Sequence, residues 1–203
     1  MDDFIIFFHL AGDGYFFEKS YEKINKVLTN NKLNEHTIYC YNGSIKKINL
    51  NPTEHTIYLR NDCNLFESTT LNFLLKECQN FDKNKKVLYI HTKGAYNYEK
   101  PIYDDWIDVM SYFTIEKYKT CLSYLNDFDA VGVDYLLDPW KHFSGNFWWA
   151  NSDHIKKLTK ISSKDRYVCE KWICSEKGKF LNLFTTGINV LEKKRCIKES
   201  YIV

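Results

Sequence analysis

Three features are missing from this sequence of 203 residues: a long hydrophobic run, a bias in charge and paired cysteines. No apolar stretch approaches the roughly 20 residues that span a bilayer, and the opening residues lack the basic region of a secretory leader. Lys and Arg number 28 against 26 Asp and Glu, so no overall field favours nucleic acid or an anionic membrane. We therefore expect a soluble, cytoplasmic protein that captures any anionic ligand with a local cluster of charges.

The cysteines and glycines exclude several further classes of site. The 7 cysteines are scattered singly with no CxxC spacing for zinc, which indicates reduced and mostly buried thiols. Neither a P-loop nor a Gly-x-Gly-x-x-Gly turn is present, and Gly12-Asp13-Gly14 is too short a match to either. The length and the hydrophobic fraction of 44% favour one globular domain over residues 1–203.

Hydrophobic periodicity predicts strands that alternate with helices along the first two thirds of the chain. The expected strands are Phe4–Phe8, His36–Tyr41, Glu54–Leu59, the run that ends at His91, and Asp129–Tyr135. The expected helices are Phe16–Leu28, Ser68–Asn80, Asp104–Leu125, a short one from Ser152 or Asp153 to Leu158, and Arg166–Glu176. This alternation predicts an α/β fold with a mixed, mainly parallel sheet flanked by helices.

The most informative segment is Val87–Gly94, a short apolar strand that ends in His-Thr-Lys-Gly. Ligands of open α/β sheets bind where such strands end. His91 offers hydrogen bonds or a proton and Lys93 a point charge, and both suit a diphosphate. The alternative is that polar residues simply mark the exit of a strand, and this segment alone does not decide between the two.

A second dense cluster, His142–Asn151, contains Asn146 and the adjacent Trp148 and Trp149. On a strand the two indoles point to opposite faces, so one ring can pack in the core while the other stacks on the face of a sugar. The alternative is a structural β segment rich in tryptophan. A third element, Arg166–Ile173, carries Glu170, which is either a general base or one half of a solvated ion pair with Arg166.

Four motifs in order resemble a group of GT-A-fold glycosyltransferase-like proteins. They are the His-Thr-Lys-Gly strand end, the Asp-Trp-x-x-x-Met-x-Tyr-Phe helix of 105–113, the His-Phe-Ser-Gly-Asn-Phe-Trp-Trp-Ala-Asn block and the Arg-x-x-x-Glu-x-Trp-Ile helix of 166–173. The chain is more distantly similar to rhamnan-synthesis F proteins, which have a related His-Thr-Lys strand end. The resemblance covers about residues 55 to 175 and implies a GT-A-like fold.

The resemblance further implies a site for a nucleotide-sugar donor. It puts five residues near the nucleoside, namely His9, Gly12, Arg60, Asn61 and Asp62. His91, Lys93 and His142 would then stabilise the diphosphate, while Asn146, Trp148 and Trp149 would bind sugar.

The chain departs from the wider fold at the strand end where most members carry Asp-x-Asp for a divalent metal. His91-Thr92-Lys93 stands there instead. Either His91 and Lys93 neutralise the diphosphate directly, or Mn²⁺ or Mg²⁺ is held elsewhere, with Asp134 at the end of the next predicted strand as a candidate. We favour the first alternative and expect no obligatory cofactor.

The resulting hypothesis is a nucleotide-sugar-dependent glycosyltransferase, inverting in stereochemistry, that serves surface or capsid polysaccharide or glycoprotein synthesis. Its partners would be the donor and a glycan or other hydroxyl acceptor. Glu170 is the first candidate for the general base and Asp153 the second. The alternative is a non-catalytic GT-A-like module that only binds a nucleotide or a glycan.

Overall fold

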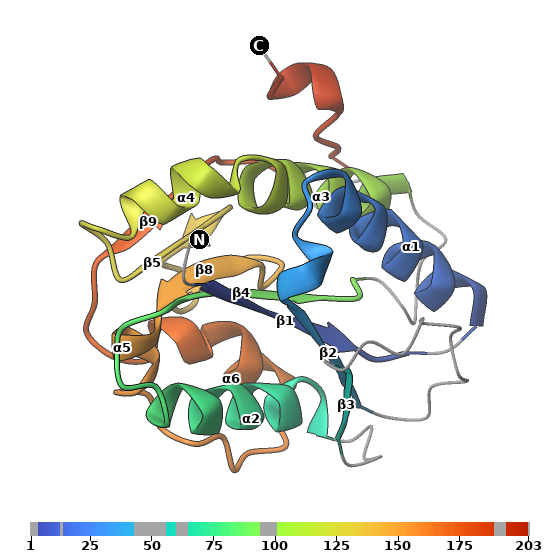
Figure 1. Ribbon diagram of the computed structural model, residues 1–203. Coiled ribbons are helices and arrows are strands. Elements are labelled where there is room, and N and C mark those ends of the chain that lie inside the picture. Colours follow the sequence, from blue (N-terminus) through green and yellow to red (C-terminus); the bar gives the residue numbers. More distant parts are fainter. Residues whose placement is uncertain are drawn as a thin grey trace.

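The computed structural model describes residues 4–12, 14–42, 56–59, 65–93, 101–188 and 194–202. Its centre is a seven-stranded sheet in the order β3-β2-β1-β4-β8-β5-β9 (Figure 1). The strands are β1 (Phe4–Leu10), β2 (Thr37–Tyr41), β3 (Thr56–Tyr58), β4 (Lys86–His91), β5 (Ala130–Gly132), β8 (Trp148–Asn151) and β9 (Phe180–Asn182). Only β8 runs antiparallel to its neighbours within this sheet. The predicted mainly parallel α/β fold is therefore confirmed.

Helices cover both faces of the sheet (Figure 1). One face carries α1 (Gly14–Asn30), α3 (Pro101–Ser111), a π-helical turn (Tyr112–Glu116) and α4 (Tyr118–Tyr124). The other face carries α2 (Ser68–Gln79), α5 (Ser152–Ile155) and α6 (Arg166–Lys171). A separate hairpin pairs β6 (Tyr135–Leu136) with β7 (His142–Phe143). Among the described residues, no helix combines the length and the apolar character needed to traverse a bilayer.

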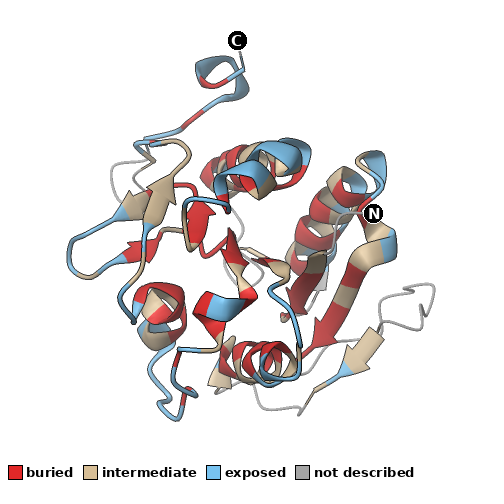
Figure 2. Cartoon of the chain, turned by 60° about the vertical axis from the view of Figure 1, so that its left-hand side comes forward, coloured by how far each residue is buried: buried red, intermediate tan, exposed pale blue. Residues whose placement is uncertain are grey.

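The central strands are long apolar runs because both of their faces are covered. Val87, Leu88, Tyr89 and Ile90 of β4 are all fully buried, as expected of a strand between two helical layers. Figure 2 shows the same pattern in colour, with buried residues along the sheet and on the inner faces of the helices, and exposed residues on their outer faces.

The predicted continuous helix Asp104–Leu125 is wrong, because the chain forms α3, the π-helical turn and α4 in succession. The amide of Lys117 bonds to the carbonyl of Tyr112 at 3.0 Å, which is the wider π spacing. The indole N–H of Trp149 donates to the freed carbonyl of Thr114 at 2.6 Å. Tertiary packing against the sheet thus interrupts a sequence that is periodic enough for one helix.

The remaining boundaries differ by smaller amounts. The segment 142–150 holds two strands, because a tight turn with positive φ at Gly145 and Asn146 separates β7 from β8. The helix predicted from Arg166 to Glu176 is helical to Lys171 and then becomes a 3₁₀ turn, Trp172–Cys174. β9 was not predicted.

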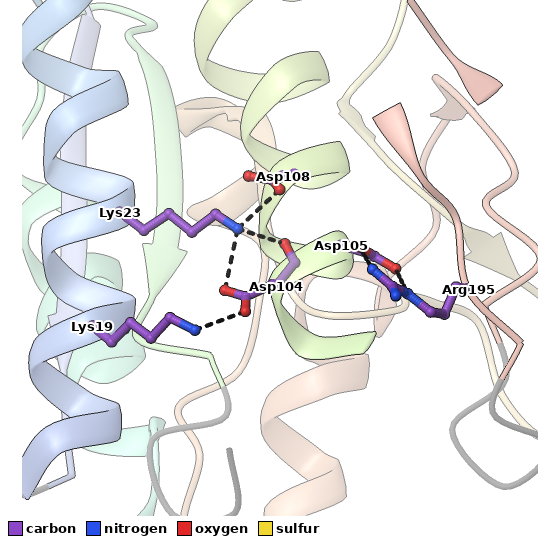
Figure 3. Close-up of polar contacts among 6 residues, drawn as sticks. All are labelled: Lys19, Lys23, Asp104, Asp105, Asp108 and Arg195. Carbon is purple, nitrogen blue, oxygen red and sulfur yellow. Dashed lines mark hydrogen bonds and ion pairs between the residues drawn. The ribbon is translucent and has the colours of Figure 1, made fainter. Parts of the chain in front are cut away.

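Ion pairs fasten α3 on two sides (Figure 3). Lys19 and Lys23 of α1 reach Asp104 at 2.8 and 3.2 Å, and Lys23 also reaches Asp108 at 2.9 Å. On the other side, Arg195 of the C-terminal segment makes a bidentate pair with Asp105, with N–O distances of 2.5 and 2.7 Å. The helix that follows the His-Thr-Lys segment is therefore held from both ends of the chain.

Candidate functional site

The carboxyl ends of β1 and β4 bring two predicted site residues side by side. His9 and His91 are paired in register on these adjacent parallel strands. The Nδ1 atom of His9 lies 2.7 Å from the hydroxyl of Thr70, and Nε2 of His91 donates to the carbonyl of Gly145 at 2.9 Å. Both imidazoles are buried, so their orientations are fixed before any ligand arrives.

Thr92 links the loop after β1 to the end of β4 through hydrogen bonds. Its hydroxyl donates to the carbonyl of Ala11 at 2.7 Å and accepts from the Ala11 amide at 3.2 Å. The amide of Thr92 also donates to the carbonyl of His9 at 3.1 Å. Gly12 follows directly with φ of 117°, a conformation that glycine adopts without strain. The loop after β1 is thereby tied to the strand end at His91.

A partly buried carboxylate, Glu67, forms the polar centre of this edge. Its Oε2 accepts from the phenol of Tyr89 at 2.8 Å and from the side-chain amide of Asn146 at 2.7 Å. The Asn146 carbonyl oxygen in turn accepts from the indole N–H of Trp148 at 2.8 Å. The network joins the start of α2, the strand β4 and the turn before β8.

Opposing effects set the protonation of this cluster. Burial acts to raise the pKa of Glu67, but the charges of His91 and His9 and the hydrogen bonds from Tyr89 and Asn146 hold it below its ordinary value. Burial lowers the pKa of His9 to about 4, against the opposing attraction of Glu67. At neutral pH, His9 is therefore a neutral hydrogen-bonding group beside an ionised carboxylate.

Lys93 lies two residues beyond His91 with its Nζ 4.1 Å from the centroid of the Trp106 ring. Burial lowers its pKa, while the charges of Glu170 and Glu67 raise it and Arg166 adds to the lowering. The charge of Glu170 therefore acts on the Lys93 ammonium. The Glu170 carboxylate also lies 3.7 Å from the Arg166 guanidinium on α6. The site combines cationic donors with partly exposed carboxylates, a set that can bind a polar anion and accept a proton.

Comparison with known proteins gives a family but no function. The model of a family described as a domain of unknown function, DUF8361, matches residues 18–166. The chain belongs to this family. No curated protein matches it. Among solved structures, it is similar to a "putative nucleotide-diphospho-sugar transferase" from Desulfovibrio desulfuricans G20, with 9% identity and a TM-score of 0.46 over 91% of this chain and 81% of that one.

In this DUF8361 chain, several predicted site residues do converge at the edge formed by β1 and β4. His9, His91 and Asn146 belong to the hydrogen bonds described above, Gly12 lies in the loop after β1, and the charge of Glu170 acts on Lys93. His142 is buried on β7, where its Nδ1 donates to the carbonyl of Trp140 at 2.8 Å; no contact among the described residues joins it to His91 or Lys93. Arg60, Asn61 and Asp62 lie outside the described residues, so their predicted role near the nucleoside stays a prediction.

The predicted sugar-binding role does not fit Trp148 and Trp149, because both side chains are fully buried. Their predicted opposite orientation is confirmed, since Trp149 packs in the core under α1 and α3 and Trp148 in the core under α2 and α6. Both rings are thus enclosed, and neither has a face to offer to a sugar.

Asp153 is at the wrong edge of the sheet to serve as the general base. β8 runs antiparallel to β4, so its last residue, Asn151, pairs with Lys86 at the start of β4. At about 3.3 Å per residue, this start lies roughly 16 Å from the strand end at His91. The Asp153 carboxylate is exposed there and pairs with Lys156 at 3.1 Å.

The carboxylate of Asp134 is already engaged by the protein. Its two oxygens accept from the amide and the hydroxyl of Thr186 at 2.7 and 2.5 Å. Burial raises its pKa, and the bonds from Thr186 oppose that rise. Within the described ranges, no group of three or more His, Cys, Asp or Glu side chains is arranged to hold a metal. Asp134 therefore fits an anchor for the 184–188 segment better than a metal ligand.

Sequence reasoning missed Glu67, Tyr89, Thr70 and Trp106. Tyr89 lies within the apolar strand Val87–Ile90, where a tyrosine is counted with the core residues and its hydroxyl draws no attention. Glu67 directly precedes α2, where an acidic residue is commonly explained by the helix dipole. No spacing in the sequence links Glu67 to a strand and a turn that follow it by 22 and 79 residues.

Proposed function

We propose that this protein is a glycosyltransferase that moves a sugar from a nucleotide-sugar donor to a hydroxyl of a glycan or similar acceptor. The observation that carries the proposal is the grouping of His91 and Lys93 at the carboxyl end of β4, beside β1, with the charge of Glu170 on α6 acting on Lys93. On this proposal, Lys93 supplies a cation for the leaving diphosphate and Glu170 a carboxylate for the acceptor proton. The resemblance of the His-Thr-Lys-Gly and Arg-x-x-x-Glu motifs to GT-A-fold proteins points the same way.

The donor would lie across the carboxyl ends of β1 and β4, where ligands of open α/β sheets bind. Lys93 and His91 would neutralise the diphosphate together with His142, and Gly12 would let the backbone approach it. Because these groups supply the positive charge, we propose that no divalent metal is obligatory. Arg60, Asn61 and Asp62 complete the proposed nucleoside side of the site.

In the proposed reaction, the acceptor oxygen bonds to the anomeric carbon while the bond from that carbon to the diphosphate oxygen breaks. The electron pair leaves with the nucleoside diphosphate, and Glu170 takes the proton of the acceptor hydroxyl. Attack from the face opposite the leaving group inverts the configuration. Positive charge held in place before the reaction stabilises the departing diphosphate. The product would belong to a surface or capsid polysaccharide or a glycoprotein.

One observation favours the alternative of a module that binds without catalysis. The Arg166 guanidinium lies 3.7 Å from the Glu170 carboxylate, which is the spacing of an ordinary i, i+4 ion pair on a helix and needs no catalytic role. The two alternatives differ in one measurable property, since a transferase slowly hydrolyses its donor in the absence of acceptor.

Thermal shift with nucleoside diphosphates and nucleotide sugars, with and without manganese, tests the donor site. At 100 times Kd, binding stabilises by about 2.7 kcal/mol, or about 5 to 10 °C for a chain of this size. We expect such a shift without manganese, its loss in Lys93→Ala, and its retention in Lys119→Ala on α4. A shift that requires manganese would contradict the metal-free site. The absence of a shift with every nucleotide would contradict the proposal that the protein binds a nucleotide-sugar donor.

Donor hydrolysis then separates an enzyme from a binder. Glu170→Gln should slow it by at least about 100-fold, the usual contribution of a general base. Glu176→Gln, an exposed glutamate beyond the same helix, should leave the rate unchanged. Nucleotide-dependent stabilisation without hydrolysis would support the binding module, and a rate within about threefold in Glu170→Gln would remove Glu170 as the base.

A further inference from the structure

Two partly exposed aromatic rings contact each other between the hairpin β6–β7 and α6, the helix that carries Glu170. Trp140, in the loop of the hairpin, and Tyr167, in the first turn of α6, have ring centroids 5.3 Å apart at 57°. Tyr167 is 44% exposed, and Leu137 in the same hairpin loop is 67% exposed. We call the Trp140 and Tyr167 rings the ring pair.

Several contacts hold the ring pair in position. The carbonyl of Trp140 accepts from Nδ1 of His142, and the Trp140 and His142 rings are 6.1 Å apart. The Nζ of Lys171 lies 5.6 Å from the Trp140 ring, and the Arg166 guanidinium lies 5.1 Å from the Tyr167 ring. Asp165 caps α6 by accepting from the amide of Tyr167 at 3.0 Å. A ligand that stacks here would therefore meet rings that are already ordered.

The ring pair borders the proposed reaction centre. Tyr167 and Glu170 are three residues apart on α6, so they share a face of the helix. The charges of Glu170 and Arg166 both act on Lys93 at the end of β4. A molecule on the ring pair would thus lie next to the carboxylate proposed to take a proton.

The chemistry around the rings suits a saccharide. A pyranose presents a C–H face that packs on aromatic rings and a rim of hydroxyls that both donate and accept hydrogen bonds. Charges of both signs lie around the ring pair, because Arg166 contacts the Tyr167 ring and Glu170, and Lys171 contacts the Trp140 ring. In the part of the chain that the structure describes, the buried indole N–H of Trp140 has no hydrogen-bond partner. A protein partner would need about 800 Å² of this surface, far more than two rings present.

We infer that Trp140 and Tyr167 form the subsite for a neutral acceptor saccharide, stacked so that one hydroxyl reaches Glu170. The assignment of this saccharide as an acceptor rests on the proposed function, but saccharide binding itself does not. The ring pair takes the role that the buried Trp148 and Trp149 cannot fill.

Saturation-transfer NMR with a panel of neutral di- to tetrasaccharides, on the full chain, tests the subsite. Parent protein should transfer saturation to the ring C–H protons of at least one saccharide. Tyr167→Ala should weaken its binding at least about tenfold, or 1.4 kcal/mol, while Tyr167→Phe, which keeps the ring, should stay within about twofold. Tyr124→Ala is the matched control, because Tyr124 is 41% exposed and lies near the start of β4.

The outcomes separate this inference from the proposed function. The nucleotide-dependent thermal shift should be the same in Tyr167→Ala as in the parent, which also confirms that the variant folds. Saccharide binding that depends on Tyr167 supports the subsite even if no nucleotide stabilises the protein. An equal saccharide affinity in Tyr167→Ala and Tyr124→Ala, or no binding by the parent, overturns the subsite and leaves the donor site untouched.

Discussion

The phenol of Tyr89 donates a hydrogen bond of 2.8 Å to Oε2 of Glu67, across 22 residues of sequence. Tyr89 is fully buried in the centre of β4, and burial together with Glu67 raises its pKa well above the ordinary value. The hydroxyl therefore stays protonated at neutral pH and can donate to Glu67. It fixes the carboxylate beside the paired imidazoles of His9 and His91.

Tyr89→Phe should destabilise the protein by about 1.5 to 3 kcal/mol, the typical loss for a hydrogen bond to a charged group. The ring packing is kept, so the loss reports the hydroxyl alone. Urea unfolding measures it, and Tyr124→Phe on the exposed face of α4 should change the free energy of unfolding by less than about 0.5 kcal/mol. If Tyr89→Phe behaved like Tyr124→Phe, the hydrogen bond to Glu67 would contribute nothing to stability.

His9 should make stability fall with acid before most carboxylates titrate. Its pKa is about 4 in the folded chain against 6.5 when unfolded, so the unfolded state binds more protons between these values. The contribution of neutral His9 to the free energy of unfolding is therefore fully present above about pH 6.5. It is lost as the pH falls towards 4, by about 3 kcal/mol in all. Free energies of unfolding from pH 7 to 4.5 check this, and His9→Gln should flatten the slope. An unchanged slope in that variant would contradict the assignment.

The folding pattern could be predicted where it is local. Apolar runs and turn residues identified β1, β2, β4 and the helices α1 and α2, and the predicted orientation of Trp148 and Trp149 to opposite faces is confirmed. The direction of β8 could not be predicted, because an antiparallel strand in a mainly parallel sheet has no signature of its own. Because β8 is antiparallel to β4, Asp153 follows it at the end of the sheet where β4 begins, away from His91.

The candidate site was predictable only where it lies on a strand end. His9, His91 and Lys93 follow apolar runs, and the rule that ligands bind at strand ends identifies them. Glu67 and the Trp140–Tyr167 pair depend on contacts between distant segments, so their grouping exists only in the folded chain. The burial of Trp148 and Trp149 also follows from the helices that cover the two faces of the sheet, an arrangement that no local pattern encodes.

Arg195 should hold the C-terminal segment against α3 more firmly than the lysines of α1 hold its other side. The Arg195 pair with Asp105 is bidentate and Asp105 is 9% exposed, whereas Lys19 and Asp104 are 39% and 28% exposed. Removing Arg195 leaves a nearly buried carboxylate without its partner, while exposed pairs contribute little. Arg195→Met should therefore destabilise more than Lys19→Met in urea unfolding.

Hydrogen exchange gives the same prediction a local readout. Tyr201 packs on Val109 of α3 in the cluster that also holds Cys196. Amides near Tyr201 should exchange faster in Arg195→Met and keep their parent rates in Lys19→Met. Equal exchange in the two variants would mean that apolar packing, and not the ion pair, holds the segment.

A side chain at Gly145 should destabilise the folded protein for two separable reasons. Its φ is 89°, and a Cβ built there would meet the Met110 sulfur at 2.5 Å and the Trp106 indole nitrogen at 3.0 Å. Gly187 also has positive φ, 63°, but its nearest atom to an added Cβ is the Lys194 Nζ at 3.4 Å. Gly187→Ala therefore measures the backbone penalty alone, about 1 to 2 kcal/mol, and Gly145→Ala should add about 1 to 3 kcal/mol of overpacking.

Substitution of Gly145 should also affect the candidate site. The Gly145 carbonyl accepts from His91 at 2.9 Å, and the Lys93 Nζ packs on the ring of Trp106. A Cβ that displaces this turn moves both His91 and Trp106. Gly145→Ala, studied at a temperature where it remains folded, should lose most of the nucleotide-dependent thermal shift, while Gly187→Ala should keep it. Retention of the full shift in Gly145→Ala would show that the turn supports the fold but does not position the groups proposed to bind the diphosphate.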